Sequence, residues 1–90
     1  MQIDPIRQRN ILDQDYVSRK DLQDLYGWSR RQADMEFRYI LEDIISDYQP
    51  IMYRGKTCLI PLDRILNKYP LNYARISRSA NRKIQEGTIE

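Results

Sequence analysis

The chain has 90 residues, enough for one domain, and 41% hydrophobic with 31% charged residues is a globular composition. It contains no histidine, which removes the commonest general base and every mechanism built on a Ser–His or Cys–His pair. The three glycines are too dispersed for a phosphate-binding loop, and one cysteine supports neither an internal disulfide nor a Cys–His zinc site. We therefore expect a non-enzymatic protein without cofactor or metal.

Positive charge is concentrated in the second half of the chain, although the net charge is only +2. Residues 16–47 hold five basic and seven acidic residues, whereas residues 48–90 hold eight basic and three acidic ones, a net charge of +5. A basic half suits contact with a polyanion. No apolar run approaches the roughly 20 residues that span a bilayer, and the N-terminus lacks a signal-peptide core. We therefore expect a soluble, cytoplasmic protein with no membrane partner.

The first elements follow from capping signals. Asp4-Pro5 suits an N-cap followed by proline at the first helical position, so residues 1–15 are expected to form either a short helix or a loosely held arm. Residues 16 and 17 are long enough only for a bridging strand. Ser18 and Asp21 have the spacing of a capping box, and Gly27 is placed to end the helix that they begin.

A longer amphipathic helix is predicted from about Arg30 to Asp47, with Ser29 as its N-cap and Pro50 beyond its end. Its apolar residues fall within about 100° of arc at helical spacing. They are Ala33, Phe37, Ile40, Leu41, Ile44 and Tyr48. This stripe predicts the face that the helix buries.

The pattern then changes to that of a β-hairpin. Two apolar runs, 51–53 and 57–60, flank Arg54-Gly55-Lys56, which predicts a three-residue loop. Residues 62–69 have the spacing of a short helix between Pro61 and Pro70. Residues 70–90 are basic, and the sequence leaves open whether they form a helix or a frayed tail. The expected fold class is mainly α with a small β-hairpin (α+β), arranged as a winged helix-turn-helix over residues 16–69.

Residues 16–69 resemble the DNA-binding domains of MerR-type regulators and of phage and transposon excisionases. The resemblance rests on Ser18-x-x-Asp21-Leu22-x-x-Leu25-x-Gly27-Trp28-Ser29, followed by Ser29-Arg30-Arg31-Gln32-Ala33 at the start of the recognition helix. Residues 51–61 resemble the wing of that family, and residues 62–69 its closing helix. The resemblance implies sequence-specific binding of double-stranded DNA by an excisionase-like recombination directionality factor, or by a small transcriptional regulator of a mobile element or phage.

The resemblance also implies roles for individual residues. Arg31 and Gln32 would read base edges, and Met35 would touch a thymine methyl group. Arg38, Tyr39 and the hydroxyl of Ser29 would hold phosphates, while Glu42 would repel them. The expected DNA-binding residues are Ser29, Arg30, Arg31, Gln32, Met35, Arg38, Tyr39, Arg54 and Lys56. Self-association or cooperative binding on DNA, and a recombinase or other protein partner, are compatible with this role.

Several of these residues, and Trp28 beside them, also have a purely structural interpretation, and Arg54 and Lys56 would then be ordinary solvated turn residues. Arg30 has i,i+4 spacing to Asp34 and would then form a surface ion pair. Met35 would be buried against the tail, and Trp28 would fill the space between the two helices. A second hypothesis for the whole chain is a winged-helix protein–protein adaptor, or a subunit of a replication, transfer or packaging complex. Failure to bind DNA at low salt, together with a stable protein complex, would select it.

Overall fold

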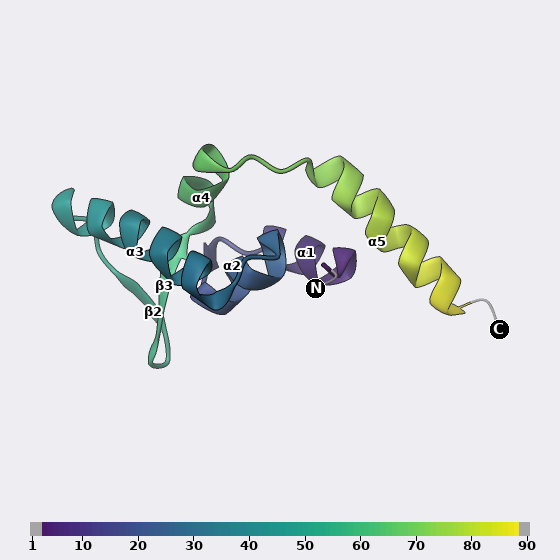
Figure 1. The fold of residues 1–90 in the computed structure, drawn as a ribbon, viewed down its shortest axis with the longest axis horizontal. Helices are drawn as coiled ribbons and strands as arrows, with labels where there is room; N and C mark the ends of the chain where they lie inside the picture. The colour runs from purple at the N-terminus through teal and green to yellow at the C-terminus, as the bar shows by residue number, and fades with distance from the viewer. Residues whose placement is uncertain (1–2, 89–90) are drawn as a thin grey trace.

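The computed structural model describes residues 3–88 as a mainly helical α+β arrangement with a small antiparallel sheet (Figure 1). The predicted fold class is confirmed at this level. In chain order the elements are α1 (Pro5–Leu12), β1 (Tyr16–Val17), α2 (Arg19–Tyr26), α3 (Arg30–Ser46), β2 (Met52–Arg54), β3 (Thr57–Pro61), α4 (Leu62–Lys68) and α5 (Tyr73–Thr88).

The caps that the sequence predicts set the starts of the first three helices. Asp4 accepts a hydrogen bond from the Ile6 amide at 3.0 Å, so the N-terminal segment begins a helix. Ser18 and Asp21 form a reciprocal capping box at the start of α2. Gly27 ends α2 at a φ of 70°, a left-handed conformation that glycine adopts without steric cost. Three residues then connect α2 to α3.

The end of α3 departs from the predicted stripe at Tyr48. The Tyr48 amide donates to the Ile45 carbonyl at 3.1 Å, and the Gln49 amide donates to the Ile44 carbonyl at 3.0 Å. These are the two hydrogen bonds of a Schellman cap, which puts Tyr48 in the left-handed region with a φ of 58°. The side chain is turned outward and is 96% exposed, so its prediction as part of the buried face was wrong.

The sheet has the strand order β1-β3-β2. Val17 lies opposite Ile60 in the short β1–β3 ladder, and Arg54 lies opposite Thr57 in the β2–β3 hairpin. Arg54 therefore belongs to β2, and the hairpin turn has two central residues, Gly55 and Lys56, instead of the predicted three. Gly55 has a φ of 61°, as the first central residue of a II′ turn requires, so the strands twist without a bulge.

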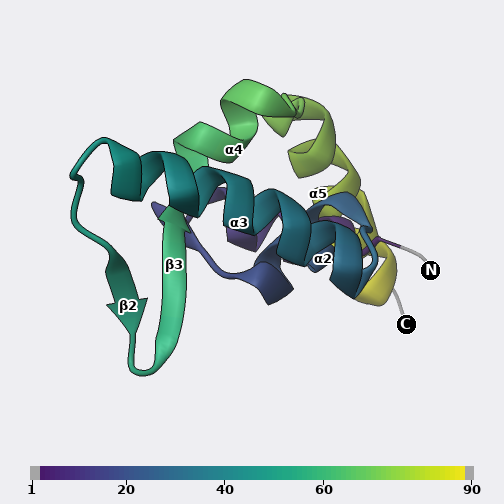
Figure 2. The same ribbon diagram turned by 60° about the vertical axis from the view of Figure 1, so that its left-hand side comes forward.

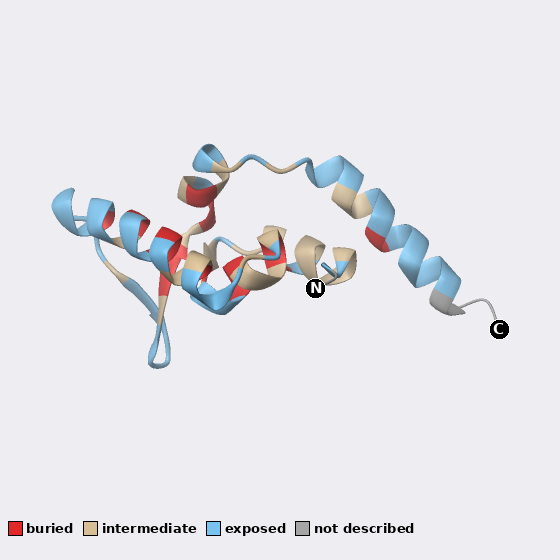
Figure 3. Ribbon diagram, in the orientation of Figure 1, coloured by how far each residue is buried: buried red, intermediate tan, exposed pale blue. Residues whose placement is uncertain are grey.

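One hydrophobic core joins the predicted helices to the sheet. The apolar face of α3 covers β3 and faces α2, and α4 closes the adjacent side (Figures 1 and 2). Figure 3 shows the buried residues on these inner surfaces. The cluster consists of Ile11, Val17, Leu22, Leu25, Ala33, Phe37, Ile40, Ile44, Ile60, Leu62 and Ile65. Burial of these side chains is the main free energy available to stabilise the domain.

The C-terminal segment is a helix, which resolves the alternatives that the sequence left open. Asn72 accepts a hydrogen bond from the Arg75 amide at 3.0 Å at the start of α5. The helix packs on α1, with Ala80 fully buried and the Arg9 guanidinium donating to Asn81 at 2.7 Å. Among residues 3–88, no helix combines the length and apolar character needed to cross a membrane.

Candidate nucleic-acid interface

The outer face of α3 is open to solvent along its length. Met35 is 43% exposed and Tyr39 is 53% exposed, whereas Phe37 on the opposite face is fully buried. A shallow hollow of about 300 Å³ follows this surface, lined by Arg31, Asp34, Met35, Arg38, Tyr39 and Glu42. Met35 is therefore not packed against the C-terminal segment, because α5 contacts α1 instead. Four of the predicted contact residues, Arg31, Met35, Arg38 and Tyr39, therefore share a surface that a ligand can reach.

A second, larger hollow lies between α2 and the start of α3. It has a volume of about 640 Å³ and is lined by Arg19, Lys20, Gln23, Arg30, Arg31 and Asp34. Four cations and one carboxylate give this α2–α3 hollow a net positive charge. The sequence analysis missed Arg19 and Lys20, although the capping box at Ser18 puts both in the first turn of α2. Their proximity to α3 depends on how the two helices pack.

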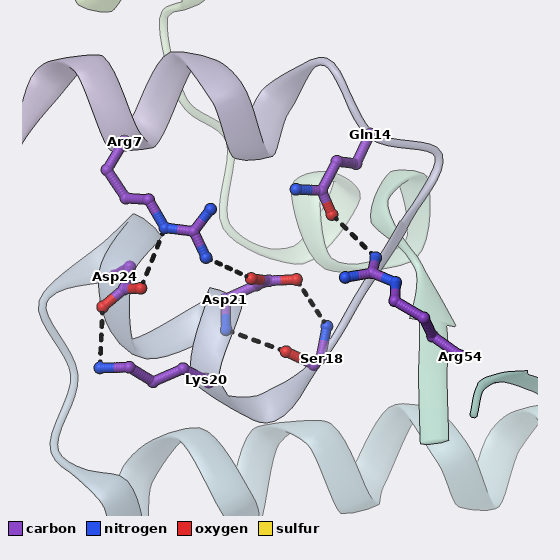
Figure 4. Close-up of polar contacts among 7 residues, drawn as sticks. All are labelled: Arg7, Gln14, Ser18, Lys20, Asp21, Asp24 and Arg54. Carbon is purple, nitrogen blue, oxygen red and sulfur yellow. Dashed lines mark hydrogen bonds and ion pairs between the residues drawn. The ribbon is translucent and has the colours of Figure 1, made fainter. Parts of the chain in front are cut away.

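Arg30 and Arg31 are the two free cations of the α2–α3 hollow. Arg19 binds Asp34 at 2.7 Å and Lys20 binds Asp24 at 3.1 Å (Figure 4 shows the second pair). Neither Arg30 nor Arg31 has an ion pair or side-chain hydrogen bond within residues 3–88.

The expected alternative, an Arg30–Asp34 surface pair, is not formed. Asp34 is occupied by Arg19 and by Arg38, whose guanidinium lies 3.1 Å away. Arg38 is thus paired within its own helix, although its side chain remains 65% exposed. The unpaired positive charges of the α2–α3 hollow therefore lie in the first turn of α3.

Gln32 is drawn away from the outer face by Glu36. The Gln32 amide donates to Glu36 at 3.4 Å, and Lys68 of α4 reaches the same carboxylate at 3.1 Å. The Glu36 side chain is only 7% exposed, so this acid on α3 is buried and neutralised by α4. The hydrogen bond to Glu36 raises the pKa of Lys68 above its ordinary value. Gln32 is thus less available to a ligand than Arg31.

Lys68 also places a cation next to Tyr39. Its ammonium lies 5.2 Å from the Tyr39 ring centroid and 5.6 Å from that of Tyr69. Beneath it, Trp28 stacks on Tyr26 with ring centroids 4.4 Å apart and meets the edge of Tyr69 at 5.0 Å. Trp28 is therefore a packing residue, but it lies half-buried between the end of α2 and Tyr69 after α4 instead of between α2 and α3 as expected. Because Lys68 is 36 residues from Gln32 in sequence, no local pattern indicates the cluster.

Ser29 is the N-cap of α3, and its hydroxyl can still donate a hydrogen bond to a ligand. Its oxygen accepts a hydrogen bond from the Gln32 amide at 3.1 Å. The hydroxyl proton remains available to donate, and the positive end of the helix dipole lies at the same place.

The two faces of the hairpin differ in what they offer. Because side chains alternate along a strand, Tyr53 shares the face of its cross-strand partner Cys58 and of the core residue Ile60. That face is the one that α3 covers, and Tyr53 is 60% exposed beyond it. The sequence analysis missed Tyr53, although alternation from Ile60 predicts its direction.

Arg54 projects from the opposite face of the hairpin. Its guanidinium donates to Gln14 in the α1–β1 connection at 3.3 Å, as Figure 4 shows. Lys56, in the turn, is exposed, and its side chain has no ion pair or hydrogen bond to any other residue among 3–86. The two predicted cations of the hairpin are therefore not equivalent: Lys56 is free, and Arg54 reaches back toward α1.

Comparison with protein-family models, with curated proteins and with solved structures finds no match to this chain.

Proposed function

We propose that this protein binds double-stranded DNA as a winged helix-turn-helix, with the first two turns of α3 in the major groove and the β2–β3 hairpin as the wing. Because residues 16–69 resemble excisionases and MerR-type regulators, we propose that it acts as an excisionase-like recombination directionality factor or as a small transcriptional regulator of a mobile element. The observation that carries the proposal is the pair of unpartnered arginines, Arg30 and Arg31, on an open helix face beside the positive α2–α3 hollow.

The arrangement of elements supports this proposal. Two helices joined by a short turn with a left-handed glycine are the arrangement of a helix-turn-helix, whose second helix enters the groove. A hairpin with an exposed lysine at its turn follows α3 directly. Helix α5 packs on α1 and leaves α3 free (Figure 2). Helix α4 contacts α3 through Lys68, beside Tyr39, whereas Arg30, Arg31 and Met35 remain exposed.

The free groups suggest how the contacts divide. Arg31 projects from the first turn of α3 and is the base-reading residue, since arginine pairs with guanine in a bidentate manner. Met35, one turn later, contacts a thymine methyl group. Arg30, Lys20 and the Ser29 hydroxyl hold phosphates at the helix N-terminus. Glu42 marks the end of groove contact, because a carboxylate repels the backbone.

The test is a binding titration on genomic and random duplexes at two salt concentrations. Replacing Arg31 with alanine should reduce discrimination between preferred and random sequences by about 1–3 kcal/mol. Replacing Lys56 should weaken binding to all sequences alike, and should lower the slope of log K against log salt concentration by about 0.9. Arg75→Ala removes an exposed, unpaired charge from α5 and serves as the control. An Arg31→Ala protein with unchanged sequence preference would refute the assigned reading residue.

The alternative function, a protein–protein adaptor, has its own support on another surface. A hollow that includes three carboxylates and several apolar side chains lies between the α1–β1 connection and α4. If the chain fails to bind any duplex at low salt, the DNA proposal fails, and a stable complex with a partner protein would then select the adaptor function.

A further inference from the structure

The outer face of α5 carries a row of arginines that no other described residue neutralises. At 100° per residue, Arg75, Arg78 and Arg82 fall within about 60° of arc. All three are exposed, and none has an ion pair or side-chain hydrogen bond within residues 3–86. Along the helix axis the row spans about 10 Å. We call it the arginine row.

The arginine row points away from the proposed DNA-binding face. Its direction is about 180° around the helix from Ala80, which is fully buried against α1. Helix α1 in turn lies between α5 and α2, to which Arg7 ties it through Asp21 and Asp24 (Figure 4). Figures 1 and 2 both show α5 at the end of the 52 Å molecule opposite the hairpin. The row therefore lies on the far side of α1 from α2 and α3.

A complementary surface is present elsewhere on the same chain. The hollow between the α1–β1 connection and the start of α4 has a volume of about 430 Å³. Its lining combines the carboxylates of Asp13, Asp15 and Asp63 with apolar side chains, and we call it the acidic hollow. Asp13 accepts a hydrogen bond from Tyr73 at 3.0 Å, whereas Asp15 and Asp63 are exposed and unpaired within residues 3–86. It contains no cation.

The acidic hollow also lies on the side of the sheet away from α3. Tyr16 and Pro61, which pair across β1 and β3, line the hollow, whereas their neighbours Val17 and Ile60 point into the core beneath α3. DNA bound to α3 would therefore leave both the acidic hollow and the arginine row accessible.

We propose that the arginine row of one copy docks in the acidic hollow of a second copy, in a head-to-tail contact. The charges are opposite, and the two surfaces are on different parts of the chain. A head-to-tail contact joins different surfaces of the two copies, so it builds a ring where the rotation between copies closes and an open chain where it does not. One helix face against a shallow hollow is smaller than a standard interface of about 1,600 Å², so the association is weak and sensitive to salt.

The experiment is sedimentation velocity of the full chain without DNA, over a concentration series. The wild-type weight-average mass should rise with concentration at about 50 mM salt and return to the monomer value at about 500 mM. The variants R78E/R82E and D15K/D63K should each remain monomeric. An equimolar mixture of these two variants should associate, since every row then meets a hollow of opposite charge.

Two further proteins control for net charge and for folding. R30E/K56E changes the net charge as much as R78E/R82E, and Arg30 and Lys56 are unpaired among residues 3–86 and lie outside both surfaces, so it should associate like the wild type. Asp63 lies in the first turn of α4, where a lysine is unfavourable, so D15K alone serves as a second hollow variant. Circular dichroism checks that each variant is folded.

Several results would overturn the proposal. They are a wild-type chain that stays monomeric at low salt, variants that associate as the wild type does, and a mixture that fails to associate. If the wild type is monomeric and a separate titration shows that R78E/R82E loses affinity for DNA, the arginine row binds nucleic acid instead of a second copy. Because the measurement uses no DNA, its outcome is independent of the proposed DNA binding.

Discussion

The pair formed by Glu36 and Lys68 should couple α3 to α4 by a measurable free energy. At 3.1 Å and an effective dielectric constant of about 20, the gross attraction of two unit charges is about 5 kcal/mol. The carboxylate is buried, but the lysine side chain is 47% exposed, so solvent screening removes most of this. We expect a coupling of about 1.5 kcal/mol, between the values of exposed and fully buried pairs.

A double-mutant cycle measures this coupling. The unfolding free energies of the wild type, Glu36→Gln, Lys68→Met and the double variant are compared by urea denaturation, with thermal melting as a second probe. Lys68→Met alone should lower the Tm by about 6–12 °C, because it leaves the buried carboxylate with only neutral donors. Lys68→Arg keeps the charge and is the matched control. A coupling below about 0.5 kcal/mol would show that α4 does not hold α3 through this pair.

Three other predictions concern backbone conformation and pH. Tyr48→Gly should stabilise the protein by about 0.5–1 kcal/mol in urea denaturation, because it relieves a left-handed residue whose side chain is 96% exposed; a loss of stability would contradict the strain. Gly27→Ala should destabilise by about 1–2 kcal/mol, since its Cβ would lie 2.8 Å from Cδ1 of Ile3 at a φ of 70°, and Gly27→Asn should cost less. Burial, and then the nearby Tyr69, raises the pKa of the Tyr26 hydroxyl from 10.0 to about 12. The protonated hydroxyl therefore stabilises the folded state fully below pH 10, and this stabilisation is lost as the pH rises from 10 to 12. Melting at several alkaline pH values should show that loss in the wild type and less of it in Tyr26→Phe, and equal slopes would contradict it.

The sequence by itself determined the elements whose signals are local. The capping box of Ser18 and Asp21, the left-handed Gly27 and the N-cap Ser29 act over one helical turn, so their hydrogen bonds form wherever the rest of the chain lies. The apolar stripe of α3 depends only on helical periodicity, which is why its buried face was predicted correctly up to Ile44.

Only the tertiary structure decided which surfaces face one another. The Asn72 cap could have indicated a helix at the C-terminus, but nothing local shows that α5 packs on α1 or that its arginines face outward. The same holds for Glu36, which lies at the edge of the apolar stripe, because only the packing of α4 brings the Lys68 ammonium to its carboxylate. Tyr48 has core spacing and is nevertheless exposed, because the Schellman cap reverses the chain there. Contacts between distant segments depend on packing of the whole core, whereas short-range patterns record only the hydrogen bonds and periodicity of their own turn.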